Sequence, residues 1–240
     1  MKRGVSGDDA RARLDAVAAE HSLDQAALAR LATVVELVST DPHAPTSVTV
    51  PAEVVDVHIA DSLSALSVLD ELAPGLIADV GSGAGFPGIP LAVARPAVGV
   101  DLVEASRRSC EFLGRVRAAL GLERLRVVNR RAEEWAREEG RTRYDAVVVR
   151  AVAPLPVLLE YGAPLLREEG TMVAWKGGED EPGASEAAEL VGMELVGVVP
   201  TRPYPASRRR RLYLYRRVRA FPEFLPRRPG MARKRPLSPD

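Results

Sequence analysis

The sequence predicts an α/β fold: a mostly parallel β-sheet with helices on both faces and a helical extension at the N-terminus. From residue 76 onward, short runs of β-branched and other apolar residues alternate with helical segments. This alternation is typical of a parallel sheet covered on both sides. Several of the runs are apolar throughout, as expected for strands that are buried on both faces.

The N-terminal part of the chain has helical periodicity. Residues 8–20 and 24–39 have apolar side chains at three- and four-residue steps, and Asp24 is a suitable N-cap for the second helix. Three prolines predict a loop over residues 40–51. One further helix is expected over residues 52–72, ended by the Pro-Gly pair that follows.

The strands of the sheet are predicted from the apolar runs. They are Leu76–Val80, Val98–Val103, Leu125–Asn129, Asp145–Val149, Thr171–Trp175, Glu194–Val199 and Leu212–Val218. No helix is expected between the last two strands, so they are predicted to form an antiparallel pair at one edge of the sheet.

Length and composition indicate one domain. The 240 residues divide into an N-terminal helical extension (1–72), an α/β core (73–219) and a basic C-terminal tail (220–240). The single cysteine, Cys110, excludes an intrachain disulfide, and we expect it to be a buried small hydrophobe without a nucleophilic role. No residues have metal-ligand spacing, so no metal is expected. Without an apolar run of about 18 residues or a signal peptide, the protein is expected to be cytoplasmic and away from membranes. It is also expected to be a monomer.

Charge is distributed unevenly along the chain although the net charge is zero. Residues 202–240 contain 13 Lys and Arg and two acidic residues, a net charge of +11, and the rest of the chain carries −11. A basic segment on an acidic body favours contact with a nucleic acid over a merely solubilising role. Candidate phosphate contacts are Arg208, Arg209, Arg227 and Arg228.

A glycine-rich loop marks the predicted ligand site. Gly81, Gly83 and Gly85 directly follow the first strand, and a helix is expected to begin near Pro87. Glycine lets the backbone turn sharply and approach a ligand closely. The loop would lie at the carboxyl end of a strand, where this class of fold binds ligands. The next strand ends at Glu104, whose carboxylate can accept hydrogen bonds from both ribose hydroxyls of an adenosine.

Two details favour S-adenosylmethionine (SAM) over a nicotinamide dinucleotide in this loop. Asp79 stands where a dinucleotide site usually has an apolar residue, and it can orient the loop or the ammonium group of SAM. Pro87 and Pro90 lie at the helix start, where a pyrophosphate needs free N–H groups that proline lacks.

The chain resembles a known family in several separate motifs. It is similar to the small-subunit (16S) ribosomal RNA guanine-N7 methyltransferases, also called glucose-inhibited division protein B, over roughly residues 52–237. The motifs are HIADSL (58–63), DVGSGAGFPGIPLAVARP (79–96), VEASRRSCEFL (103–113), RRAEEW (130–135), VVRAVAPL (148–155), WKGG (175–178) and RRPGMARKRPL (227–237). The fold that the resemblance implies is the Rossmann-like sheet of SAM-dependent methyltransferases. Members of the family often have Asn-Leu-Thr before the HIADSL helix, where this chain has residues 46–50 with the sequence TSVTV.

The resemblance also implies roles for individual residues. Glu104 would hold the ribose of SAM, and the adenine edge would be framed by Ala132 and Glu133, although Glu133 could instead be a solvated helix residue. The residues that would line the methionine and ribose are Gly81, Gly83, Gly85 and Phe86.

Four polar residues elsewhere are further candidates. Arg150 ends the fourth strand and is the candidate catalytic residue, because this position faces the ligand crevice and disfavours an ion-paired surface arginine. It would hold a phosphate or the SAM carboxylate in preference to a guanine acceptor such as O6. His58 and Asp61 are spaced to share a helix face, and either substrate binding or helix packing explains them. Lys176 follows a strand and is either an RNA phosphate contact or a surface lysine.

The resemblance implies methylation of guanine N7 in 16S rRNA of the small ribosomal subunit. Guanine N7 has a free lone pair and loses no proton on attack, so the reaction requires positioning rather than a general base. Two alternatives stay open at this point: a NAD-dependent oxidoreductase on a similar sheet, and a non-catalytic RNA-binding assembly factor.

Overall fold

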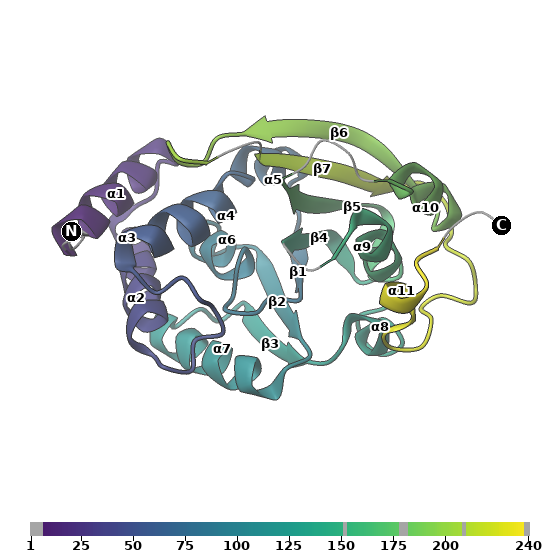
Figure 1. The fold of residues 1–240 in the computed structure, drawn as a ribbon, viewed down its shortest axis with the longest axis horizontal. Coiled ribbons are helices and arrows are strands. Elements are labelled where there is room, and N and C mark those ends of the chain that lie inside the picture. The colour runs from purple at the N-terminus through teal and green to yellow at the C-terminus, as the bar shows by residue number, and fades with distance from the viewer. Residues whose placement is uncertain (1–6, 151–152, 178–181, 208–209, 238–240) are drawn as a thin grey trace.

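The computed structural model describes residues 7–150, 153–177, 182–207 and 210–237. Within these residues, seven strands form one sheet in the order β3-β2-β1-β4-β5-β7-β6 (Figure 1). Strands β1 to β5 are parallel to one another, and β7 pairs antiparallel with both β5 and β6. The predicted mostly parallel sheet with an antiparallel edge is therefore confirmed.

The strand bounds agree with the predicted runs to within a few residues. The strands are β1 (Leu76–Val80), β2 (Gly99–Glu104), β3 (Leu125–Asn129), β4 (Tyr144–Arg150), β5 (Leu166–Lys176), β6 (Met193–Thr201) and β7 (Arg210–Arg217). The largest difference is in β5, which begins five residues before the predicted Thr171.

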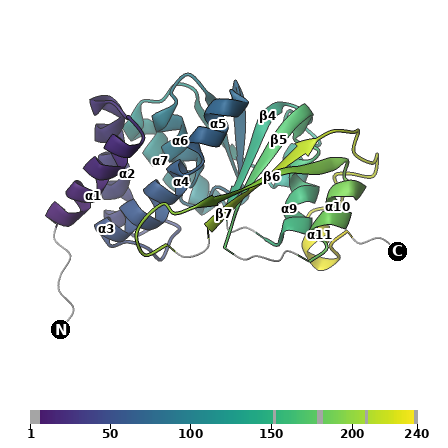
Figure 2. The ribbon, with the colours of Figure 1, turned by 90° about the horizontal axis from the view of Figure 1, so that it is seen from above.

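Helices cover both faces of the sheet, as Figure 2 shows from above. One face packs against α6 (Gly88–Ala94), α7 (Arg107–Leu120) and the N-terminal helices, and the other against α8 (Ala132–Trp135), α9 (Leu155–Gly162) and α10 (Ala184–Leu190). Side chains alternate along each strand, so that Ile77 joins the first core and Ala78 joins the second. The two cores hold the sheet rigidly between helical layers.

The N-terminal extension begins with α1 (Gly7–Glu20) and α2 (Gln25–Thr40). Asp24 caps α2 as predicted: its carboxylate accepts a hydrogen bond from the backbone N–H of Ala27 at 2.7 Å. Both helices belong to the first core through apolar residues such as Leu14 and Leu31.

The single helix predicted over residues 52–72 is wrong in detail. The segment contains α3 (Pro51–Glu53), a π-helix η1 (Val54–Ala60), α4 (Asp61–Leu63) and α5 (Leu66–Leu72). The hydroxyl groups of Ser62 and Ser64 donate to the backbone carbonyls of His58 and Asp61. Such bonds can compete with the backbone ladder of a helix, and α4 ends beside them at Leu63.

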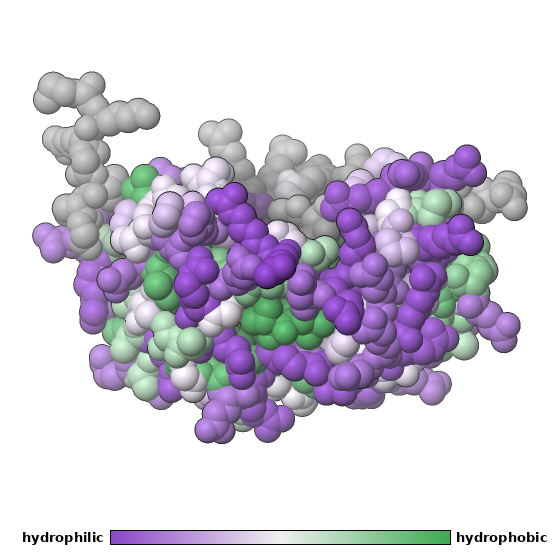
Figure 3. Space-filling view, turned by 90° about the horizontal axis from the view of Figure 1, so that it is seen from below, coloured by the Kyte–Doolittle hydropathy of each residue, from purple (hydrophilic) through white to green (hydrophobic). Residues whose placement is uncertain are grey.

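The C-terminal segment is folded against the domain. Leu225 and Ala232 are buried in the second core, and α11 (Met231–Lys234) lies beside α8 and α9 (Figure 1). Seen from below (Figure 3), the surface is mostly hydrophilic, with a smaller hydrophobic area near its centre. None of the helices within the described residues is long and apolar enough to cross a membrane.

Candidate active site

The glycine loop joins β1 to α6 at the carboxyl edge of the sheet. Gly81, Gly83 and Gly85 all have positive φ angles, between 56° and 96°, which other residues rarely adopt. Gly88 is required for a different reason: a Cβ atom there would lie 2.6 Å from the Asp79 carboxylate and 2.5 Å from Leu102. The loop therefore packs directly on β1 and β2.

Asp79 is fully buried beneath this loop. Its Oδ2 accepts a hydrogen bond from the backbone N–H of Gly88 at 2.9 Å, and its Oδ1 is buried without a hydrogen-bond partner. Burial raises the pKa of Asp79 to about 7. Of the two predicted roles, the structure places the carboxylate on the loop backbone, where it fixes the start of α6.

Glu104 ends β2 and faces the same loop. Its Oε2 accepts from the Gly83 N–H at 3.0 Å and its Oε1 from the Ser106 N–H at 2.7 Å. Each carboxylate oxygen can accept a further bond, so the side chain is oriented and still able to bind hydroxyl groups. Cys110 differs from its prediction: it is half-buried, and its Sγ lies 3.3 Å from the Glu104 carbonyl oxygen.

A first cavity of about 380 Å³ opens beside Glu104. Its lining joins the ends of β1, β2 and β4 to α8, α9 and the C-terminal segment: Val80, Gly81, Val103, Glu104, Ala105, Arg130, Arg131, Ala132, Glu133, Arg150, Tyr161, Gly230 and Arg233. Among the residues predicted to bind the cofactor, Gly81, Glu104, Ala132, Glu133 and Arg150 are brought together here.

Glu133 is buried on α8, so its alternative interpretation as a solvated helix residue is wrong. Its side chain is held from the C-terminal segment, because its Oε1 accepts a hydrogen bond from the Gly230 N–H at 2.8 Å. The pattern in the sequence missed this contact, since 97 residues separate the partners.

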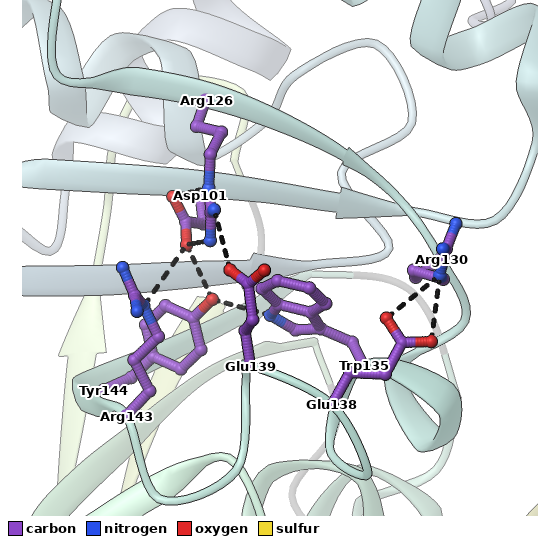
Figure 4. A network of polar contacts seen from close by, with 8 residues as sticks. All are labelled: Asp101, Arg126, Arg130, Trp135, Glu138, Glu139, Arg143 and Tyr144. Carbon is purple, nitrogen blue, oxygen red and sulfur yellow. Dashed lines mark hydrogen bonds and ion pairs between the residues drawn. The ribbon is translucent and has the colours of Figure 1, made fainter.

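A polar network anchors α8 to the sheet (Figure 4). The indole N–H of Trp135 donates to the Tyr144 hydroxyl at 2.7 Å, and this hydroxyl donates to Asp101 at 2.7 Å. Arg126 pairs with the same carboxylate at 2.7 Å and contacts Glu139. Burial and the Asp101 charge raise the pKa of Tyr144, which stays a neutral donor. The network fixes α8, and with it Glu133, against β2, β3 and β4.

Arg150 closes β4 between two helical segments. Its Nη1 donates to the Val57 carbonyl at 2.8 Å and to Asp61 Oδ2 at 2.9 Å, and its Nη2 donates to His58 Nδ1 at 3.0 Å. The guanidinium also lies 5.6 Å from the centre of the Phe86 ring. Arg150 is therefore ion-paired, but inside the ligand crevice rather than on the outer surface.

A second cavity of about 350 Å³ lies on the other side of Arg150. Its lining comes from the loop before α3, from η1 and α4, and from the glycine loop: Pro45, Thr46, Val57, His58, Asp61, Gly81, Ser82, Gly83, Ala84, Phe86, Arg150 and Arg210. Gly81 and Arg150 line both cavities, which brings the two spaces together at the end of β4.

His58 forms an aromatic wall of the second cavity. Its ring stacks on Phe86 with 4.4 Å between the ring centres. Because an arginine N–H can only donate, His58 Nδ1 accepts from Arg150, and Nε2 carries the proton that is donated to Thr46 Oγ1 at 2.9 Å. Burial and the Arg150 charge lower the pKa of His58 to about 4, so the ring is neutral at physiological pH.

Asp61 is buried on the same wall and pairs with more than one arginine. In addition to Arg150, Arg210 Nε lies 3.5 Å from its Oδ1. The indole N–H of Trp175 donates to the Asp61 backbone carbonyl at 2.8 Å. His58 and Asp61 thus meet at one site as their spacing predicted, and both position Arg150.

The other predicted RNA contacts are dispersed. Lys176 ends β5, and its Nζ donates to the Ala153 carbonyl at 3.2 Å. Arg228 is exposed, whereas Arg227 pairs with the buried Glu160, with 2.7 Å between Nε and Oε1. Arg208 and Arg209 lie outside the described residues.

Sequence reasoning missed several lining residues of the cavities. In the sequence, Thr46 stands out only as part of a departure from the family motif, and Gly230 and Arg233 only as part of the motif RRPGMARKRPL. No pattern indicated Tyr161. Among the residues that the structure describes, no three His, Cys, Asp or Glu side chains gather as a metal site requires.

Comparison with known proteins identifies the family. The model of the family rRNA small subunit methyltransferase G (GidB) matches residues 25–202. The chain belongs to this family. It is 44% identical to ribosomal RNA small subunit methyltransferase G of Rubrobacter xylanophilus over 194 residues, which cover 78% of this chain and 74% of that protein. It is 41% identical to the protein of the same name from Carboxydothermus hydrogenoformans, over 80% of this chain and 83% of that one.

Solved structures support the fold of a rRNA small subunit methyltransferase G. The mitomycin 7-O-methyltransferase MmcR has a TM-score of 0.55 at 14% identity, over 77% of this chain and 60% of that one. The 1,6-didemethyltoxoflavin-N1-methyltransferase of Burkholderia thailandensis, solved with S-adenosylhomocysteine, has a TM-score of 0.54 at 15% identity, over 80% and 88% of the two chains. The Rossmann-like methyltransferase fold is confirmed.

The site fits SAM, the cofactor of this family. Carboxylates stand at Glu104 and Glu133 along the first cavity, and the glycine loop leaves the backbone open to a ligand at Gly81. The Gly88 N–H at the start of α6 is already bonded to Asp79. The helix start therefore lacks the free N–H group that a dinucleotide pyrophosphate would require, which disfavours the NAD alternative.

Proposed function

We propose that the protein transfers the methyl group of SAM to N7 of a guanine in 16S rRNA of the small ribosomal subunit. The observation that carries this proposal is the position of Arg150 and Gly81, which line both the first and the second cavity. A cofactor in the first cavity and a base in the second would meet at this junction. Membership of the rRNA small subunit methyltransferase G family supports the rRNA substrate.

The residues of the first cavity would bind the adenosine end of SAM. Glu104 is oriented by the Gly83 and Ser106 N–H groups and would accept the ribose hydroxyls. Glu133 and the Ala132 backbone would contact the adenine edge, and the methionine would lie along the loop that contains Gly83, Gly85 and Phe86. When bound, SAM supplies a methyl group activated by a sulfonium leaving group.

The residues around Arg150 would position the acceptor. Guanine N7 attacks with its own lone pair, so the protein has to align the reactants and exclude water rather than remove a proton. The neutral His58 ring and Phe86 offer an aromatic surface to a base, and aromatic side chains commonly stack on extruded RNA bases. Arg150 would hold the SAM carboxylate or a phosphate next to the target base.

Basic residues around the site would contribute affinity for rRNA. Arg228 is exposed and Lys176 lies at the end of β5. Phosphate contacts of this kind give affinity without sequence choice, so the selection of one guanine would fall to the second cavity.

A methyl-transfer assay tests the proposal directly. Small subunits without the modification are incubated with the protein and SAM carrying a radiolabelled methyl group, and modified nucleotides are mapped by mass spectrometry. We expect one 7-methylguanosine in 16S rRNA that is absent without the protein. A product methylated elsewhere would refute the N7 assignment, and binding of rRNA without transfer would favour the assembly-factor alternative.

A further inference from the structure

The segment Pro226–Arg235, called the C-terminal strap, is tied to the domain at its start, and its end is bonded back to its start. The Arg227 guanidinium pairs with Glu160 on α9 and also donates to the Arg235 carbonyl at 2.7 Å. Arg137 donates to the Pro226 carbonyl at 2.7 Å. Glu160 is 2% exposed, so Arg227 neutralises a carboxylate that would otherwise be buried without a counter-charge. These contacts close the strap into a loop over α8 and α9.

The inner side of the strap reaches the first cavity. Gly230 and Arg233 line the cavity together with Tyr161 of α9. The Gly230 N–H donates to Glu133 at 2.8 Å. The strap thus supplies both a wall of the cavity and the bond that orients Glu133.

Gly230 can make this bond only in a particular conformation. Its φ is 80°, and a Cβ atom at this position would meet nothing within 4 Å. Glycine is therefore favoured at position 230 by the backbone conformation and not by a lack of room for a side chain. Asparagine tolerates this region of φ, whereas proline has a φ fixed near −65° and has no N–H.

The opposite side of α8 is fixed by the network around Trp135, Tyr144 and Asp101. This network holds α8 but includes no bond to the Glu133 carboxylate. Of the two sets of contacts, only the bond from the strap orients that carboxylate.

We propose that the C-terminal strap is a functional wall of the cofactor site, and that its docking on Glu133 sets the affinity for SAM in the absence of RNA. Gly230 and Arg233 are positioning residues in this account. The inference rests on the proposed binding of the adenosine of SAM in the first cavity. The basic residues of the C-terminal tail predict RNA contact alone, so the proposal gives the strap a second role.

Calorimetric titration of the full-length protein with S-adenosylhomocysteine, without RNA, tests the proposal. We expect Gly230→Pro to weaken binding about tenfold, the effect of losing a hydrogen bond to a charged group. Gly230→Asn keeps the N–H and should stay within about threefold of the wild type. Lys234→Ala, on the exposed part of α11, is the matched control and should bind as the wild type does.

A double variant separates a shared role from independent effects. Glu133→Ala and Gly230→Pro each remove one partner of the same bond. The double variant should therefore bind S-adenosylhomocysteine as tightly as whichever single variant binds it less well. Additive losses would overturn the account, as would wild-type affinity in a Gly230→Pro variant with unchanged near-ultraviolet circular dichroism.

Hydrogen exchange in the wild type provides a measurement that needs no substitution. Saturating S-adenosylhomocysteine should slow amide exchange across residues 226–235 and leave exchange in α1 unchanged. Unchanged exchange in the strap would overturn the proposal, even if the Gly230→Pro variant did not fold. Failure of the wild type to bind S-adenosylhomocysteine would instead refute the cofactor assignment on which the proposal rests.

Discussion

Arg150 Nη1 lies 2.9 Å from Asp61 Oδ2, although 89 residues separate the two in the chain. The pair joins the last residue of β4 to the first residue of α4, and both side chains are largely buried. The N-terminal extension is thus part of the candidate active site, because it positions the arginine at the junction of the two cavities.

Replacement of Arg150 should abolish most methyl transfer while the fold survives. Arg150→Ala removes the group shared by both cavities, and Arg150→Lys keeps the charge but loses the planar fork that bonds Asp61 and His58 together. Misplacement at a reacting centre costs about 100-fold in rate. We expect at least this loss for both variants in the radiolabelled-methyl assay. Arg95→Ala, which breaks a surface pair with Asp70, is the control, and normal turnover of Arg150→Ala would remove Arg150 from the mechanism.

Asp61→Asn should destabilise the protein through the same pair. Breaking a buried ion pair on one side costs about 3 kcal/mol, which corresponds to a fall of about 6–12 °C in Tm for a chain of this size. Combining it with Arg150→Gln should recover part of the loss, because the buried Arg150 guanidinium is then no longer left without its counter-charge. Asp70→Asn is the exposed counterpart and should change Tm by little. Equal shifts for Asp61→Asn and Asp70→Asn in a thermal melt would contradict the assigned burial energetics.

Asp79 should make stability fall as pH rises. Burial raises its pKa to about 7 from an ordinary value of 3.8, so between pH 4 and 7 the folded state binds more protons than the unfolded state. The free energy of unfolding then decreases with pH, by up to about 4 kcal/mol from this group. The isosteric Asp79→Asn variant lacks this term. In urea titrations, the free energy of unfolding of Asp79→Asn relative to that of the wild type should therefore be larger at pH 8 than at pH 4. The same difference at both pH values would show that Asp79 is ionised over the whole range.

His58 should act in the opposite direction. Burial and Arg150 lower its pKa from 6.5 to about 4, so the unfolded state binds the proton first as pH falls. The contribution of a neutral His58 is present above pH 6.5 and is lost as pH falls toward 4, by about 3 kcal/mol. His58→Gln should reduce this acid sensitivity in the same urea titrations. A steeper acid loss in the variant would refute the assigned neutral state.

Arg227 and Arg228 are adjacent in sequence but should respond differently. Arg228→Ala should lower rRNA affinity and reduce the slope of log affinity against log salt by about 1, the effect of one lost phosphate contact. Arg227→Ala should leave that slope unchanged and lower Tm, because it leaves the buried Glu160 without a counter-charge. Filter binding over a salt series, with thermal melts alongside, distinguishes the two, and the reverse pattern would contradict the observed ion pair.

The sequence predicts those parts of the site that are built from one continuous segment of the chain. The glycine loop, Asp79 and Glu104 follow from strand ends and backbone requirements over about 25 residues, and the sheet follows from the apolar runs. Arg150 was predicted because an arginine closing an apolar strand points to the crevice.

Contacts between distant segments could not be predicted in this way. Charge alone marks Arg227 as basic, but its partner Glu160 is 67 residues away, and only the packing of the tail on α9 brings them together. The same holds for Gly230 and Glu133. The apolar spacing over residues 52–72 also does not indicate the π-helical turn or the break between α4 and α5.

The wide turn of η1 has a consequence for how this protein tolerates change. A π-helical turn accommodates one residue more than an α-helical turn. The loss of one residue from Val54–Ala60 can therefore be absorbed by a return to α-helical geometry, which keeps the phase between α3 and α4. An inserted residue would instead rotate α3 by about a quarter of a turn relative to α4, because the segment already holds the additional residue. Insertions within η1 should therefore be more harmful than single-residue deletions.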